Sequence, residues 1–165
     1  MMFFARTVAK SDLAAVRSLL AETWHATYDM IYGPDAVARI TDEWHSISVL
    51  SRYIEKPQSE FLLADDGKRI GGVVFAEAID GGKTIILRQL YVLPELQGQG
   101  IGTGLLDEIE GCFPDAERIR LEVEEQNVRA ISYCLAQGFA RVKSEPGPME
   151  GFTTVTLERP ILWAD

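Results

Sequence analysis

A cluster of glycines between a strand-like and a helix-like segment constrains this chain more than any other feature. The residues Gln97-Gly98-Gln99-Gly100-Ile101-Gly102-Thr103-Gly104 follow an apolar segment and precede an amphipathic one. The first turn of a helix has backbone N–H groups without intrahelical partners and a partial positive charge. Glycines let the backbone approach an anion closely, so this order of segments predicts a phosphate site.

Four interpretations of the loop differ in the residues that each requires. A Walker-type loop ends in Gly-Lys-Ser/Thr, and this segment has no lysine. A Rossmann fingerprint needs glycine or alanine where Thr103 stands, and it normally opens a βαβ unit rather than following hairpins. An acyl-CoA loop has the pattern Gln/Arg-x-x-Gly-x-Gly/Ala, which Gln97, Gly100 and Gly102 match. The loop alone is also compatible with a strand-to-helix turn that binds no ligand.

Hydrophobic periodicity and turn residues predict the elements around the cluster. The predicted order is β-α-α, three strands joined by hairpins, then α-β-α-β-β. This order makes an α/β fold of the α+β type, with a mixed, mostly antiparallel sheet and helices on both faces. The predicted ranges are strand 3–8, helices 11–28 and 37–53, strands 61–64, 69–78 and 84–92, a helix ending at Pro114, strand 119–124, helix 127–138, and strands 140–143 and 152–157.

Composition limits the classes of protein to which the chain can belong. Its 165 residues fit one domain, and 47% apolar with 25% charged residues predict an ordered globular protein. The net charge of −9, without a Lys/Arg run, argues against nucleic acid and anionic membranes as partners. No apolar run approaches the roughly 20 residues that span a bilayer, and the N-terminus lacks a signal-peptide pattern, so we expect a cytoplasmic location. We expect free thiols at Cys112 and Cys134. These cysteines, His25 and His45 do not have the spacing of metal ligands, so we expect no metal site.

Two segments that flank the cluster resemble the GNAT N-acetyltransferase superfamily. Leu90-Tyr91-Val92-Leu93-Pro94-Glu95 resembles the end of the strand before that family's acyl-CoA loop. Asn127-x-x-Ala130-Ile131, followed by Gly138-Phe139, resembles its second signature. The resemblance extends from about residue 61 to residue 139, whereas the first sixty residues match only in their β-α-α order. It implies a single N-acetyltransferase domain over residues 1–165 that transfers an acetyl group from acetyl-CoA to an amine.

The resemblance also implies where acetyl-CoA binds. In that family the strand before the loop splays from its neighbour, and pantetheine lies in the gap. Leu90, Tyr91 and Val92 would line the pantetheine, and the N–H of Val92 would face the thioester carbonyl as an oxyanion donor. Asn127 would lie near the cofactor arm. The pyrophosphate is assigned to the loop residues Gln97, Gly98, Gln99, Gly100, Ile101, Gly102 and Thr103.

The sequence departs from the family where the catalytic base and acid are often found. A free lysine-type ammonium has a pKa of ~10.4, so a base or a water wire must take a proton from the amine. The strand before the loop carries no such base, and the usual tyrosine position, four residues before Gly138, is Cys134. We predict that Glu122 or Glu124 acts as the base through water, although each glutamate is also compatible with a solvated surface charge. Cys134 is either an inert core residue or the proton donor.

The acceptor site is predicted among aromatic residues of the first helices. In the family these helices wall the acceptor, and Trp24, Tyr28, Tyr32 and Glu77 are the candidates here. Aromatic rings beside carboxylates suit a cation, because the ring faces attract it. Ordinary helix core is the alternative, and it is the stronger one for Trp24, which continues the apolar face.

The sequence leaves three questions of function open. The acceptor is a small-molecule amine that is polyamine-like, amino-acid-like or antibiotic-like, or else a protein N-terminus. The absent strand base and the cysteine at position 134 also fit a non-catalytic acyl-CoA-binding regulatory domain. A nucleotide-binding enzyme is disfavoured by the missing loop lysine. A homodimer through an exposed sheet edge is compatible with the sequence, which does not show one.

Overall fold

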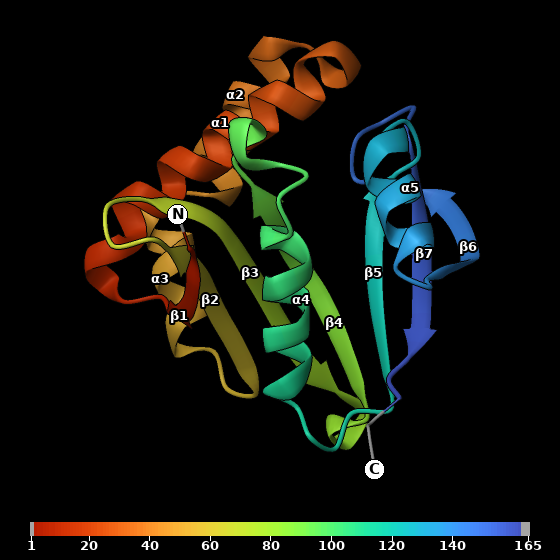
Figure 1. Cartoon of the computed structure of the whole chain (residues 1–165). Helices are drawn as coiled ribbons and strands as arrows, with labels where there is room; N and C mark the ends of the chain where they lie inside the picture. Colours follow the sequence, from red (N-terminus) through yellow and green to blue (C-terminus); the bar gives the residue numbers. More distant parts are fainter. Residues whose placement is uncertain (1, 163–165) are drawn as a thin grey trace.

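The architecture is a single seven-stranded sheet covered by helices on both faces, seen in a computed structural model that describes residues 2–162. The strand order is β1-β2-β3-β4-β5-β7-β6 (Figure 1). All neighbouring strands are antiparallel except β4 and β5, which are parallel. The predicted mixed, mostly antiparallel sheet is therefore confirmed. The strands are β1 (Phe4–Thr7), β2 (Ser59–Asp65), β3 (Ile70–Ile79), β4 (Thr84–Val92), β5 (Arg118–Glu124), β6 (Ala140–Pro146) and β7 (Thr153–Pro160).

Two sets of helices cover opposite faces of the sheet. The alternation of side chains along β2 illustrates the division: Leu62 packs on the side of α4 and α5, whereas Phe61 and Leu63 pack on the side of α1 and α3. None of the helices within residues 2–162 is long and apolar enough to cross a membrane. The helices are α1 (Leu13–Tyr32), α2 (Pro34–Trp44), α3 (Ile47–Glu55), α4 (Ile101–Gly111) and α5 (Val128–Ala136).

The predicted helix over residues 37–53 is wrong as a single element, because two helices, α2 and α3, occupy this part of the chain. His45 ends α2 with a non-helical backbone, and Ser46 is extended. The hydroxyl of Ser46 accepts a hydrogen bond from the N–H of Val49 at 3.2 Å, so it caps the first turn of α3. A serine cap can be recognised in a sequence, but here it lies inside a continuous apolar periodicity.

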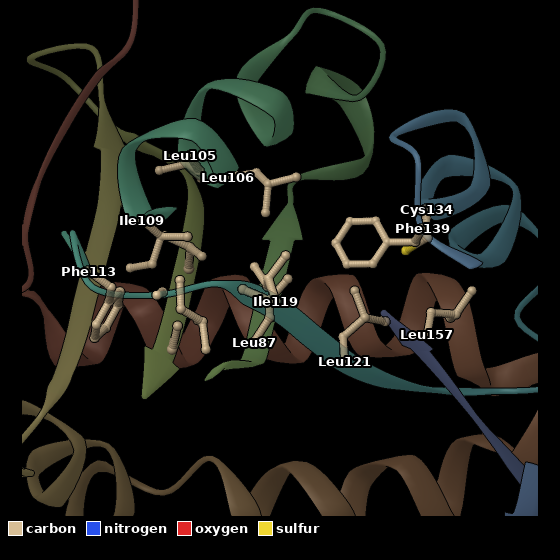
Figure 2. Packing of buried hydrophobic residues seen from close by; sticks show 14 of the residues in the cluster. Leu87, Leu105, Leu106, Ile109, Phe113, Ile119, Leu121, Cys134, Phe139 and Leu157 are labelled. Carbon is tan, nitrogen blue, oxygen red and sulfur yellow. The ribbon is translucent and has the colours of Figure 1, made fainter. Parts of the chain in front are cut away.

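The core between the sheet and α4 follows the predicted helix face. Leu105, Leu106 and Ile109 are buried and pack toward the strand residues Ile119 and Leu121 (Figure 2). Burying each such side chain contributes on the order of 1.5–3 kcal/mol relative to leaving it exposed. This core therefore fixes α4, and with it the glycine loop that precedes α4.

The parallel strands β4 and β5 pair over only part of their length. Their register runs from Thr84 opposite Arg118 to Leu87 opposite Leu121, and both strands then continue without pairing to each other. Figure 1 shows the two strands diverging toward the end of the sheet where α1 and α2 lie. The sheet is thus open between β4 and β5, as the predicted splay requires.

A β-bulge in β4 lies where the splay begins. Phe75 of β3 is opposite Gln89, and the next residue, Ala76, is opposite Leu87, so Arg88 is the extra residue. Such a bulge reverses the alternation of side chains along the rest of the strand. Leu87 belongs to the core beneath α4, whereas Tyr91 packs with the cluster on the α1 side. After the bulge, the side chains of Gln89 and Tyr91 therefore lie on the face of the sheet that α1 covers.

Candidate active site

The glycine loop has the backbone geometry of an anion-binding helix terminus. Gly98 and Gly100 have φ of 81° and 86°, a conformation that costs any residue with a Cβ. Gly100 is the N-cap of α4, and the first N–H to donate within the helix is that of Gly104, which reaches the carbonyl of Gly100 at 2.9 Å. The N–H groups of Ile101, Gly102 and Thr103 come before the first helical hydrogen bond, so they can donate to an anion.

The free edge of β4 faces the gap beside this loop. The N–H of Leu93 donates to the carbonyl of Gly71 on β3 at 2.9 Å. Because backbone groups alternate in direction along a strand, those of Leu90 and Val92 face the opposite edge, toward β5. The side chain of Gln97 donates to the carbonyl of Val92 at 3.1 Å, so it fastens the loop to the strand. Gln97 thus has a structural contact that the predicted phosphate role did not include.

Gly102 faces Val92 and Tyr133 at the side of the gap near the loop. A Cβ added at Gly102 would meet only the Val92 side chain at 3.6 Å and the Tyr133 hydroxyl at 3.8 Å. The Tyr133 hydroxyl lies 3.1 Å from Oγ1 of Thr103, so it reaches from α5 to the first turn of α4. The free edge of β4 and the N–H groups at the start of α4 fit an acyl-CoA.

A cavity of about 380 Å³ lies on the α1 side of the sheet, at the splayed ends of β4 and β5. The loop between β6 and β7 also borders it, since Pro148 and Met149 are among its lining residues. Met149 packs against the cluster formed by residues of α1 and α2. Aromatic rings make up much of the remaining wall: Trp24, Tyr28, Tyr32, Trp44, Tyr53 and Tyr91.

One wall of the cavity is a continuous series of rings. The ring of His45 lies 5.4 Å from that of Trp24, which lies 4.4 Å from that of Tyr28. Tyr28 stacks on Tyr32 at 5.3 Å with an interplanar angle of 10°. Phe152, from the β6–β7 loop, meets Tyr32 edge-on at 4.8 Å. Trp24, Tyr28 and Tyr32 therefore lie together, and the series of rings extends from the α2–α3 junction to the end of β5.

Glu124 occupies the β5 end of this wall. Only 6% of Glu124 is exposed, and its Oε1 accepts a hydrogen bond from the Tyr32 hydroxyl at 2.9 Å. Its Oε2 accepts from the N–H of Gln126 at 3.2 Å. Burial and this contact with Glu124 raise the pKa of Tyr32 above its ordinary value, so Tyr32 remains a donor. Glu122 lines the same cavity but is exposed, so the two glutamates differ in how firmly they are held.

Asn127 connects the cavity with α5. Its Oδ1 accepts from the N–H of Ala130 at 3.2 Å and caps the helix, as the sequence predicts. Its Nδ2 donates to the Tyr28 hydroxyl at 3.1 Å. Burial raises the pKa of Tyr28, so this hydroxyl also stays protonated. Asn127 therefore orients the ring of Tyr28 in the wall of the cavity.

Two polar residues that the sequence did not single out as site residues line the other part of the cavity. His45 is 4% exposed and Gln89 is 5% exposed. Nδ1 of His45 and Oε1 of Gln89 are buried and have no hydrogen-bond partner among residues 2–162. Burial lowers the pKa of His45 to about 4, so it is neutral at pH 7. The bulge turns Gln89 and the helix break places His45, and neither leaves a clear signal in the sequence.

Glu77 is separated from the residues with which it was grouped. It does not line the cavity, and its carboxylate pairs with Lys56 at 2.5 Å and with Arg88 at 2.9 Å. Burial raises its pKa, but the hydrogen bonds from these two cations outweigh burial and lower it. Glu77 therefore lies apart from the predicted aromatic residues, and Lys56, which follows α3, and Arg88 of β4 hold its carboxylate.

Cys134 lies in the core rather than in the cavity. It packs in the cluster that contains Phe139 and Leu157 (Figure 2). Burial raises the pKa of the Cys134 thiol to about 11. A buried thiol in apolar surroundings behaves as a small hydrophobic residue, which favours the structural interpretation over the proton donor.

The family model described as "Acetyltransferase (GNAT) family" matches residues 13–139. The chain belongs to the GNAT acetyltransferase family. This family is the one that the sequence resemblance indicated, and the match covers most of the open sheet, the glycine loop and both helices beside the gap. As a member, the chain is an acyltransferase.

Solved structures of N-acetyltransferases share the fold. The PaiA N-acetyltransferase from Thermoplasma acidophilum, in complex with coenzyme A, is 26% identical, with a TM-score of 0.85 over 98% of this chain and 100% of its own. Ard1 from Thermoplasma volcanium has a TM-score of 0.78 at 14% identity, over 99% and 100%. The ribosomal-protein-S18-alanine N-acetyltransferase from Escherichia coli has a TM-score of 0.71 at 17% identity, over 99% and 97%. The comparison with curated protein sequences gives no significant match.

Proposed function

We propose that this acyltransferase uses acetyl-CoA to acetylate the primary amine of a small, cationic molecule by direct attack. The observation that carries the proposal is the buried, oriented carboxylate of Glu124 in an aromatic cavity at the splay of β4 and β5. Acetyl-CoA supplies the thioester: the N–C bond forms, the C–S bond breaks, and CoA leaves as a thiolate that takes up a proton from solvent.

Aromatic faces and carboxylates attract the amine to the cavity in its ammonium form. The ring faces of Tyr28 and Tyr32 favour a cation, and the carboxylates of Glu122 and Glu124 add negative charge. The amine must then lose a proton before its lone pair can attack the thioester. Glu124, directly or through one water, is the proton acceptor, since Tyr32 and the N–H of Gln126 fix its orientation.

The backbone at the end of β4 stabilises the negative charge that develops on the thioester oxygen. The N–H of Val92 faces the gap and donates a hydrogen bond to that oxygen. The N–H groups at the first turn of α4 hold the pyrophosphate, together with the positive end of the helix. These donors are fixed by the sheet and the helix, so they need little reorganisation during the reaction.

The size of the cavity favours a small molecule over a protein segment. The cavity volume of about 380 Å³ lies within the range of small-molecule binding sites. The β6–β7 loop, held by Met149 against the α1–α2 cluster, restricts the space that an extended peptide would need.

The test is release of CoA thiol from acetyl-CoA with a panel of amines and a control without amine. The panel contains diamines, amino acids, amino alcohols, aminoglycosides and short peptides with free N-termini. Amine-dependent release with a small amine is expected. Preference for peptides would move the assignment to a protein N-terminal acetyltransferase. Thermal stabilisation by CoA without any turnover would support a non-catalytic binding domain instead.

Variants of the carboxylate test its role. Glu124→Gln removes the proton acceptor and is expected to lower kcat/KM by about 10²–10⁴-fold. Glu125→Gln is the matched control, because Glu125 is exposed and does not line the cavity. An unchanged kcat/KM in Glu124→Gln, with a large loss in Glu122→Gln, would assign the base to Glu122.

A further inference from the structure

The cavity has two chemically different parts. At the β5 end, Glu124 and Tyr32 form a charged, hydrogen-bonded pair. Along the wall, at the α2–α3 junction, the ring of His45 begins the series that leads through Trp24 and Tyr28 to Tyr32. An acceptor that fills the cavity therefore contacts a carboxylate in one part and an uncharged imidazole in another.

The buried polar atoms without partners are concentrated around this cavity. Nδ1 of His45 and Oε1 of Gln89 both belong to lining residues, and neither has a hydrogen-bond partner among residues 2–162. Leaving such a buried group unpaired is unfavourable, and proteins seldom retain one without a partner. The two residues come from separate elements, the end of α2 and the bulged strand β4, and both face the same space.

The charges nearby determine what kind of group fits. His45 is uncharged and its ring lies against Trp24, so it offers no counter-ion. The guanidinium of Arg88, which also lines the cavity, is already paired with Glu77. An additional charge next to His45 and Gln89 would be desolvated without compensation. A hydroxyl or an amide can instead donate to Oε1 of Gln89 and bond to Nδ1 of His45.

We propose that His45 and Gln89 form a specificity subsite for a second, uncharged hydrogen-bonding group of the acceptor, which makes amino alcohols and amino amides the preferred substrate class. The inference rests on the proposed function, because it assigns a second contact to the same acceptor. A site built to bond such a group rejects an analogue that lacks it, since its own polar atoms would remain unpaired.

The test compares acceptors that differ only in that group. Amino alcohols HO–(CH₂)n–NH₂ are measured against n-alkylamines with the same number of heavy atoms, over a series of chain lengths. The wild-type protein is expected to prefer the amino alcohol by about tenfold in kcat/KM at its best length. Equal kcat/KM at every length, or a preference for the alkylamine, would overturn the subsite.

Variants distinguish recognition from a structural role. His45→Phe and Gln89→Met keep the side-chain volume approximately and remove the polar atoms, so each is expected to lower the preference toward one. The kcat/KM for the amino alcohol should fall more than the kcat/KM for the alkylamine. His25→Phe is the matched control, because His25 pairs with Asp29 on α1 and does not line the cavity. An equal loss for both acceptors in the subsite variants would assign His45 and Gln89 to structure alone.

A binding measurement separates failure of this subsite from failure of the proposed function. Thermal stabilisation of the CoA-bound protein by each acceptor needs no turnover. Greater stabilisation by the amino alcohol in the wild type, lost in Gln89→Met, supports the subsite even if no amine is acetylated. Equal stabilisation by both acceptors contradicts it, whatever the activity.

Discussion

Gly100→Ala tests whether the loop geometry before α4 depends on the backbone alone. Gly100 has φ of 86°, and a Cβ built there would have no heavy atom within 4 Å. The substitution therefore causes no clash, and its only cost is the left-handed conformation, about 1–2 kcal/mol for a residue with a Cβ. For a chain of this length that cost lowers Tm by roughly 2–8 °C.

Gly104→Ala is the matched substitution, and its expected effect on stability has the opposite sign. Gly104 lies four residues later in α4, has no positive φ, and would likewise place its Cβ in open space. Alanine in a helix is about 0.5–1 kcal/mol more favourable than glycine, so this variant is expected to raise Tm by roughly 1–4 °C.

Calorimetry or urea unfolding of the two variants and the wild type measures the difference. The separation between the variants should be roughly 1.5–3 kcal/mol, the sum of the two effects. Gly100→Ala is also expected to reduce the thermal shift caused by CoA, because Gly100 directs the first N–H groups of α4. A Gly100→Ala variant as stable as the wild type, with undiminished CoA binding, would refute the reasoning.

Two further substitutions test buried side chains. Cys134→Ala is expected to lower stability by about 1 kcal/mol and to leave kcat/KM almost unchanged, whereas a loss of about 10²-fold would identify Cys134 as a proton donor. His45 has a pKa of about 4 when folded and ~6.5 when unfolded, so the unfolded state binds its proton first as the pH falls. The free energy of unfolding should drop by up to about 3 kcal/mol for this residue between pH 6.5 and 4, and His45→Phe should remove that part of the pH dependence in urea unfolding. Equal pH dependence in wild type and variant would contradict the assigned burial effect.

The local order of the chain is readable from its sequence because the relevant forces are local. The glycines before α4, the alternation of Ile119 and Leu121 in β5, and the Asn127 cap of α5 each depend on residues close in sequence. These features predicted the mixed sheet, the loop and the family. Alternation also predicted that Glu122 and Glu124 share a face, and both line the cavity.

The proposed acceptor site depends on contacts that no local pattern encodes. A single extra residue, Arg88, reverses the alternation of β4 and brings Gln89 into the cavity, and Ser46 divides an otherwise continuous helical periodicity beside His45. The Tyr32–Glu124 hydrogen bond joins residues 92 positions apart. The sequence by itself determined the strand-loop-helix that fits acyl-CoA, since backbone conformation and periodicity suffice for it. Only the tertiary structure decided which side chains face the acceptor, because strand register, a bulge and long-range packing set their directions.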